Sequence, residues 1–190
     1  MQKFGIDVRG ERFLFADVPV PPSSWLLEAL QRADKTGFGS EKSRAERLVS
    51  PLLLELSSCN HASFAALSGV RLAGDPTQGL DGECDFVLSF TRLREFVRAP
   101  IFCIVAVGYP DIEGSTARCA AQLLGAARFN ERENKPIPAL YGCVTTGIEW
   151  RFLKFENQVV TFDANCYLSN ETAKLLGVLQ QIVDRTKPVA

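Results

Sequence analysis

The chain has 190 residues, of which 46% are hydrophobic and 23% charged, and its formal net charge at pH 7 is −1. This composition is typical of a globular protein with a full core, and the balanced charge argues against a broad basic face for nucleic acid. No apolar run approaches the roughly 20 residues that span a bilayer, so we expect no membrane partner. The start of the chain also lacks the long apolar segment of a secretory signal, which predicts a cytoplasmic protein.

The six cysteines lie at least 16 residues apart, at positions 59, 84, 103, 119, 143 and 166. Zinc sites are usually built from close cysteine pairs, so this spacing argues against a metal framework. Cys103 and Cys143 fall in apolar strand patterns, and Cys119 falls in a helical pattern. We therefore expect reduced, mostly buried thiols that act as small hydrophobic side chains.

The first part of the chain is predicted to be mainly helical. The PPSS cluster at 21–24 offers a turn and an N-cap, and a helix should follow over 25–34. The apolar spacing in 41–56 predicts a second helix. Pro51 should kink this helix, or restart it with Ser50 as its cap.

The remainder of the chain alternates strands with two helices. Strand patterns occupy six segments, namely 62–73, 84–90, 101–107, 138–147, 149–156 and 158–163. The segment 101–107 is apolar on both faces, which indicates a central strand in a covered sheet. Small residues over 115–133 predict a packed helix, and a final helix should start at Ser169 with Glu171 in its first turn.

This order of elements predicts an α/β fold with a mixed sheet and helices on its faces. We expect a single domain over 1–190, because the length is ordinary for one domain. Within it, residues 1–60 should be a mainly helical N-terminal part, and residues 61–190 should form the α/β core.

Five segments, taken in chain order, resemble the PD-(D/E)XK nuclease superfamily, and in particular bacterial members of it. They are SEKSRAERLVSPLLLEL, GLDGECDFVLS, PIFCIV, DIEGSTARCAAQLLGAARFNE and YGCVTTGIEWRFLKFE. The resemblance covers most of the chain from about Gly39 onward. It implies the restriction-endonuclease-like fold, a mixed central sheet flanked by helices, here with an N-terminal helical segment.

In that superfamily an Asp ends one strand and a Glu-x-Lys lies on the next. The two acids hold Mg²⁺, and the lysine orients the attacking water. Asp85 matches the first acid, whereas the strand PIFCIV places Ala106 at the position of the Glu and Gly108 at that of the Lys. Positions 106 and 108 point to the same face of a strand, and an apolar strand alone would not require residues so small. The resemblance therefore implies a degenerate motif, with Asp85 as the vestigial metal ligand and no bound cofactor.

Other polar residues could line such a site. Glu46 lies on the polar side of the first packed helix, where this superfamily often carries an additional acid, and Asp111 and Glu113 follow the strand. Gln122 resembles a polar position that lines the site in relatives. For each acid the alternative is a solvated surface position, for Gln122 an amide without a role, and for Asp85 a structural acid at a strand edge.

The resemblance implies a catalytically degenerate nuclease-like protein with a structural, protein-binding or weak nucleic-acid-binding role. The alternative is an active Mg²⁺-dependent DNA endonuclease with a relocated acid and Arg118 as a substitute cation. The implied partners are DNA, bound weakly, or another protein, and a homodimer stays open. Further arginines, Arg92, Arg94 and Arg98, cluster between the two core strands, where loops face DNA in active relatives.

Overall fold

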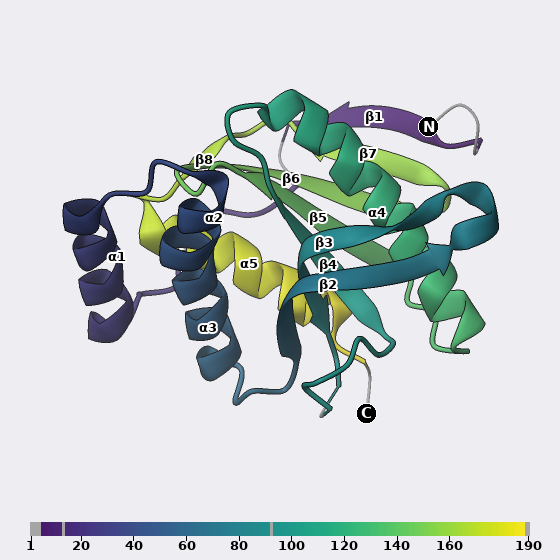
Figure 1. Cartoon of the computed structure of the whole chain (residues 1–190), viewed down its shortest axis with the longest axis horizontal. Coiled ribbons are helices and arrows are strands. Elements are labelled where there is room, and N and C mark those ends of the chain that lie inside the picture. Colours follow the sequence, from purple (N-terminus) through teal and green to yellow (C-terminus); the bar gives the residue numbers. More distant parts are fainter. Residues whose placement is uncertain (1–4, 13, 92, 189–190) are drawn as a thin grey trace.

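The computed structural model describes residues 5–12, 14–91 and 93–188, and these contain a mixed sheet with helices on its faces (Figure 1). The strands are β1 (Asp7–Glu11), β2 (Ala65–Asp75), β3 (Leu80–Ser89), β4 (Ile101–Val107), β5 (Ala139–Thr145), β6 (Glu149–Glu156), β7 (Val159–Asp163) and β8 (Tyr167–Leu168). Their order is β1-β7-β6-β5-β4-β3-β2, and β8 pairs with β6 off this path. The pairs β1–β7 and β4–β5 are parallel, and the other pairs are antiparallel. The predicted mixed α/β fold is confirmed at this level.

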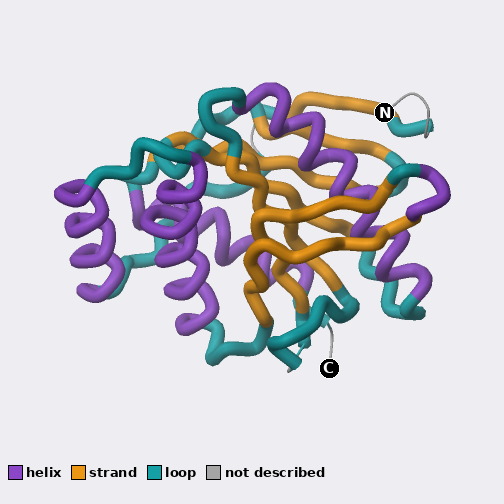
Figure 2. Tube along the Cα trace, in the orientation of Figure 1, coloured by secondary structure: helices purple, strands orange, loops and turns teal. Residues whose placement is uncertain are grey.

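The helices form two groups around the sheet. They are α1 (Ser24–Thr36), α2 (Glu41–Arg44), α3 (Ser50–Cys59), α4 (Ile112–Arg132) and α5 (Thr172–Thr186). Helices α1 to α3 gather beside one end of the sheet, whereas the long α4 crosses several of its strands (Figures 1 and 2). Within the described ranges, no helix is long and apolar enough to cross a membrane.

Strand β4 lies in the interior of the sheet, between β5 and β3, and all seven of its residues are buried, as the sequence predicts. Phe102 and Val105 belong to the apolar cluster that includes residues of α3 and α5. Ile104 and Ala106 belong to the second cluster, which is formed with residues of α4. A strand covered on both faces needs a continuous apolar sequence, which is the pattern that 101–107 shows.

The segment predicted as one helix over 41–56 is interrupted by a π-helical turn, η2 (Ala45–Val49). Helix α3 then restarts at Ser50, and Pro51 stands in its first turn, where a missing N–H is harmless. The backbone N–H of Ser50 donates to the carbonyl of Ala45, five residues back. The expected restart is therefore confirmed, but Ser50 does not cap the helix with its side chain.

Two other boundaries differ from the sequence predictions. Strand β1 was not expected, because Val8 is its one large apolar residue and the segment therefore has no apolar alternation. It forms by parallel pairing with β7, so the mainly helical part at 1–60 also contributes a strand to the sheet. Helix α5 was predicted to start at Ser169, but it starts at Thr172 with Glu171 at the N-cap position. The Thr172 hydroxyl donates to the backbone carbonyl oxygen of Ser169 at 2.7 Å.

Candidate functional site

Asp85 lies where strands β3 and β4 separate. Their backbone pairing ends at Phe86 opposite Val105. Beyond this pair, the carboxylate of Asp85 takes the place of a backbone acceptor from β3. Its Oδ2 accepts the backbone N–H of Val107 at 2.9 Å. On the other neighbour, β2, Gly69 has a φ of 59°, a left-handed conformation that suits glycine and distorts the strand at this level. Asp85 thus replaces a backbone acceptor for a buried strand.

The cation beside Asp85 comes from a helix and not from the neighbouring strand. Arg118 of α4 places its Nη2 3.3 Å from Asp85 Oδ2 and 2.9 Å from the carbonyl oxygen of Val107. The side chains of Arg118 and Asp85 are 44% and 29% exposed, so solvent screens the pair and its own stabilisation is about 0–1 kcal/mol. The guanidinium nevertheless places a positive charge beside Asp85 Oδ2.

The small residues at 106 and 108 have a packing cause. Ala106 is fully buried in the cluster formed with α4. A Cβ on Gly108 would lie 2.4 Å from Ser115 Oγ and 3.0 Å from the Asp111 carbonyl oxygen, because the first turn of α4 presses on this backbone. The helix, and not the strand itself, therefore requires a residue without a side chain at 108. A lysine there needs α4 to shift.

A hollow of about 430 Å³ opens beside Asp85, and four acids and one lysine are among the residues that line it. This acidic hollow is lined by Glu41, Lys42, Ala45, Glu46, Ser50, Ser68, Gly69, Glu83, Asp85 and Phe86. The structure thus brings Glu46 and Asp85 to one cavity, whereas Ala106, Gly108 and Gln122 do not line it. Among the described residues, no three His, Cys, Asp or Glu side chains are grouped closely enough to hold a metal ion.

The other acids considered from the sequence lie elsewhere. Asp111 is the N-cap of α4, and its Oδ1 accepts the backbone N–H of Gly114 at 2.9 Å. Glu113 follows in the first turn of the same helix and is not part of the acidic hollow. Negative side chains near the N-terminus of a helix stabilise it by interacting with the helix dipole, so both acids have a structural role in α4.

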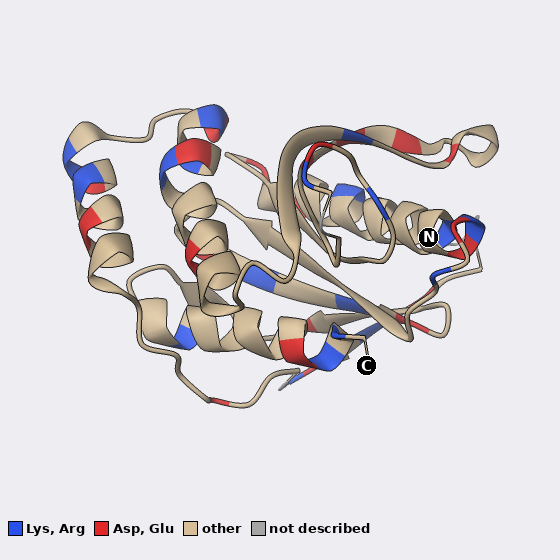
Figure 3. Cartoon of the chain, turned by 90° about the horizontal axis from the view of Figure 1, so that it is seen from below, with Lys and Arg blue, Asp and Glu red and all other residues tan. Residues whose placement is uncertain are grey.

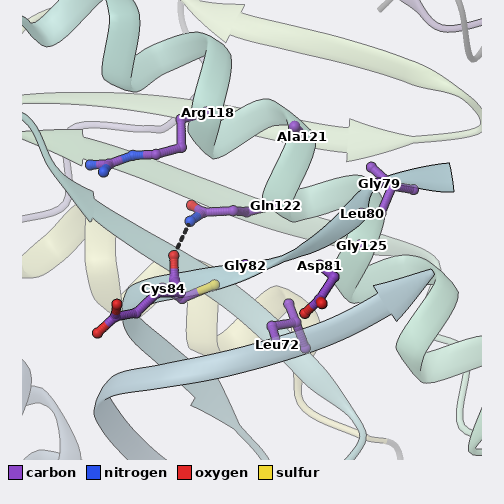
Figure 4. Close-up of a pocket in the computed structure, with 11 residues that line it drawn as sticks. Leu72, Gly79, Leu80, Asp81, Gly82, Cys84, Arg118, Ala121, Gln122 and Gly125 are labelled. Atoms are coloured by element: carbon purple, nitrogen blue, oxygen red, sulfur yellow. Dashed lines mark hydrogen bonds between the residues drawn. The ribbon is translucent and has the colours of Figure 1, made fainter. Parts of the chain in front are cut away.

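Gln122 lies one turn after Arg118 on α4, and it faces β3 from the helix side (Figure 4). Its Nε2 donates to the backbone carbonyl of Glu83 at 2.9 Å. The neighbouring Cys84 is buried, and this burial together with the charge of Asp85 raises the pKa of its thiol to about 12. Cys84 therefore stays a neutral thiol at physiological pH.

Sequence reasoning missed two acids of the hollow, Glu41 and Glu83. Glu83 stands two residues before Asp85 on β3, a spacing that puts both on one side of a regular strand. Glu41 reaches the site because α2 lies over the end of β4, where its Oε2 accepts the Tyr109 N–H at 3.3 Å. The first could have been found from strand spacing, whereas the second depends on tertiary placement.

The arginines of α4 are engaged within the chain, whereas the loop between β3 and β4, which the resemblance places towards DNA, carries an exposed arginine. Arg128 pairs with Glu131 at 2.9 Å, and Arg132 donates to the carbonyls of Ala73 and Gly74. Arg94 is exposed in the β3–β4 connection, and Arg92 lies outside the described residues. In Figure 3, basic and acidic positions both occur on α1 and in the region of α2.

Comparisons with protein-family models, with curated proteins and with solved structures give no match. The class that fold and site define is a mixed α/β protein with a helix-covered sheet. Its candidate site combines one acid that supports the strand ladder, an arginine from α4 and an adjoining acidic hollow.

Proposed function

We propose that the chain is a catalytically degenerate relative of the PD-(D/E)XK nucleases, and that it acts in the cytoplasm by binding and not by hydrolysis. The order of its parts supports this proposal. An acid on β3 is followed by the adjacent apolar strand β4 and then by the alanine-rich helix α4 packed on that strand. This is the order of parts on which the resemblance to the restriction-endonuclease-like fold rests.

The observation that carries the proposal is the engagement of Asp85. Its Oδ2 accepts the Val107 N–H and lies beside the Arg118 guanidinium. Mg²⁺ is held by carboxylates, waters and substrate phosphate, and a fixed cation at the same oxygen opposes a dication by Coulomb repulsion. Ala106 and Gly108 supply neither the second acid nor the lysine. Such a site lacks both the second carboxylate that would ligate the metal ion and the lysine that would activate water.

The role that follows is binding to another protein or weakly to DNA, without a cofactor. The net charge of −1 and the internally bonded arginines of α4 limit any DNA contact to local patches. A weak DNA complex should depend strongly on salt, because phosphate contacts release counterions.

The second candidate is a Mg²⁺-dependent endonuclease with a relocated acid. The acidic hollow favours it, because Glu46 and Glu83 line the same cavity as Asp85. In this candidate Arg118 replaces the missing lysine as the cation beside the reacting phosphate.

Cleavage of single- and double-stranded DNA with Mg²⁺ or Mn²⁺ tests the proposal, together with calorimetry of metal binding. We expect no cleavage above background and no heat of binding for the wild type. Arg118→Met removes the cation beside Asp85, and Arg128→Met is the matched control, since Arg128 also forms an ion pair on α4. Cleavage by the wild type that disappears in Asp85→Asn would establish the second candidate. Metal binding that disappears in that variant would also contradict the proposal.

A further inference from the structure

A groove of about 420 Å³ lies between the first and third helices, where the amino end of α1 lies beside the carboxyl end of α3 (Figures 1 and 2). This α1–α3 groove is lined by Ser23, Trp25, Leu54, Glu55, Ser58 and Cys59. The first two residues come from the start of α1, and the other four come from α3. None of them lines the acidic hollow, so the groove is a separate feature of the molecule.

Glu55 is a buried acid in this groove. The residue is only 5% exposed, and among the described residues both of its carboxylate oxygens accept hydrogen bonds from Ser23. Oε1 accepts the backbone N–H of Ser23 at 2.7 Å, and Oε2 accepts its hydroxyl at 2.8 Å. Ser23 is also the N-cap of α1, so this contact joins the two walls of the groove and holds the carboxylate between them.

The negative charge of Glu55 lacks a full counter-charge. Among the residues that the structure describes, no lysine, arginine or histidine forms an ion pair with it. The amino end of α1 supplies only about half of a positive charge, and each carboxylate oxygen has a further lone pair for a second donor. A buried charge without a partner is costly. A cation that enters the groove therefore gains an ion pair that the folded chain does not make.

The charge of Glu55 also acts on a second residue of the groove. Cys59 stands one turn after Glu55 on α3, and it is exposed. Partial desolvation and the negative charge of Glu55 raise the pKa of its thiol. The same charge that disfavours a thiolate at this wall attracts a cation to it.

The mouth of the groove carries apolar surface. Trp25 and Leu54 are 50% and 57% exposed, one on each helix. Tryptophan is the aromatic side chain that attracts cations most strongly over its ring, and a leucine can cover an alkyl stem. Ser58 adds a hydroxyl that can accept an N–H. The groove therefore combines a fixed carboxylate with surface suited to an apolar body.

We propose that the α1–α3 groove binds an ammonium ion on an apolar stem, with the nitrogen at Glu55 and the stem between Trp25 and Leu54. A free amine and the side chain of a lysine on another protein share this chemistry. The groove volume lies within the roughly 300–1,000 Å³ of small-molecule sites, so it accommodates either source. This proposal goes beyond the proposed function, and neither depends on the other.

Titration with phenethylamine, which is protonated at neutral pH, and with its neutral analogue phenethyl alcohol tests the proposal. Amide and indole shifts of the protein in NMR locate the site. We expect the amine to bind at least tenfold more tightly, because a charged donor forms a stronger bond with a carboxylate than a neutral one. A blocked Leu-Lys-Leu tripeptide and its analogue with norleucine in place of lysine form the second arm. Binding of the amine assigns a free ligand, whereas binding of the lysine peptide alone assigns a protein side chain.

Variants separate the charge from the apolar surface. Glu55→Gln keeps an amide that can bond to Ser23, so it should weaken the amine about tenfold or more and leave the alcohol unchanged. Trp25→Leu keeps an apolar side chain and should weaken the amine about two- to fivefold, the worth of an exposed cation–π contact. Glu28→Gln removes an exposed acid of α1 outside the groove, so this matched control should bind as the wild type does.

The wild-type comparison of amine and alcohol needs no variant to fold. Equal binding of these two ligands, shifts outside the groove, or undiminished amine binding by Glu55→Gln would overturn the proposal. The absence of binding by both the amine and the lysine peptide at millimolar concentration would also overturn it.

Discussion

Replacing Asp85 distinguishes an acid that supports the fold from one kept to hold a metal. In the structure its carboxylate accepts the N–H of Val107, a fully buried residue of the central strand. Asp85→Ala leaves this donor without an acceptor, whereas Asp85→Asn keeps an amide oxygen in the same place. Asp85→Asn therefore removes the charge alone, whereas Asp85→Ala removes both the charge and the hydrogen bond.

The expected losses follow from the two contacts. A buried donor left unpaired costs about 1–3 kcal/mol, and the half-exposed pair with Arg118 adds about 0–1 kcal/mol. Asp85→Ala should lower the free energy of unfolding by about 2–3 kcal/mol, and Asp85→Asn by about 1 kcal/mol or less. If Asp85 were instead a metal ligand grouped with Glu41, Glu46 and Glu83, its replacement should raise the free energy of unfolding in the absence of metal. The reason is that removing one of several like charges relieves their repulsion.

Urea unfolding followed by tryptophan fluorescence measures these differences, because Trp150 is fully buried on β6. Asp81→Ala is the matched control. Asp81 is an acid of the same strand that pairs with Arg71, and it should cost no more than about 1 kcal/mol. Equal losses for the alanine and asparagine variants would refute the hydrogen-bond argument. A gain in stability for both would show that Asp85 lies in a repulsive, metal-type site.

Two further predictions concern packing and thiols. Gly108→Ala should lower the free energy of unfolding by about 1–3 kcal/mol, because the added methyl group overpacks the contact with α4. Adding Ser115→Gly to this variant should recover part of the lost stability. Wild-type stability of Gly108→Ala would contradict the close contact with α4. Native alkylation followed by mass spectrometry should label Cys59 and Cys166, which are exposed, and leave the other four cysteines unmodified until urea is added. Burial raises the pKa of Cys84 and Cys119 from 9.0 to about 12, so the unfolded chain loses these protons first. Stability should then fall as pH rises above about 9, and urea midpoints that do not fall between about pH 8 and about pH 10 would count against buried thiols.

The fold could be predicted where a local pattern decides the structure. Seven consecutive apolar residues in Ile101–Val107 indicate a strand covered on both faces, and the structure places β4 in the interior of the sheet, between β5 and β3. The small residues of Ile112–Arg132 similarly indicate a packed helix. Strand β1 could not be found this way, because it is polar and owes its conformation to pairing with β7, about 150 residues away.

Several residues of the candidate site around Asp85 could be predicted from the sequence, whereas the contacts between them could not. Asp85, Glu46 and Arg118 were all identified from the sequence, and two of them, Asp85 and Glu46, line the acidic hollow. The contact between Arg118 and Asp85 joins a helix to a strand 33 residues apart, so no local pattern encodes it. The contact of Ser115 with Gly108 likewise depends on how α4 enters from its N-cap, and that is why the glycine was interpreted only as a lost lysine.

The packing of α4 decides which side chains fit beside Asp85. Once position 108 has no side chain, the first turn of α4 can approach the backbone until Ser115 occupies the space that a lysine stem needs. Arg118, one turn further along, then supplies the positive charge beside Asp85 from the helix. The acid consequently gains a structural role, because it pairs with this arginine and holds the end of β4. A lysine introduced at 108 alone would meet Ser115. An acid introduced at 106 alone would bury a second negative charge near Asp85. Each single substitution is therefore expected to be unfavourable, for a different physical reason.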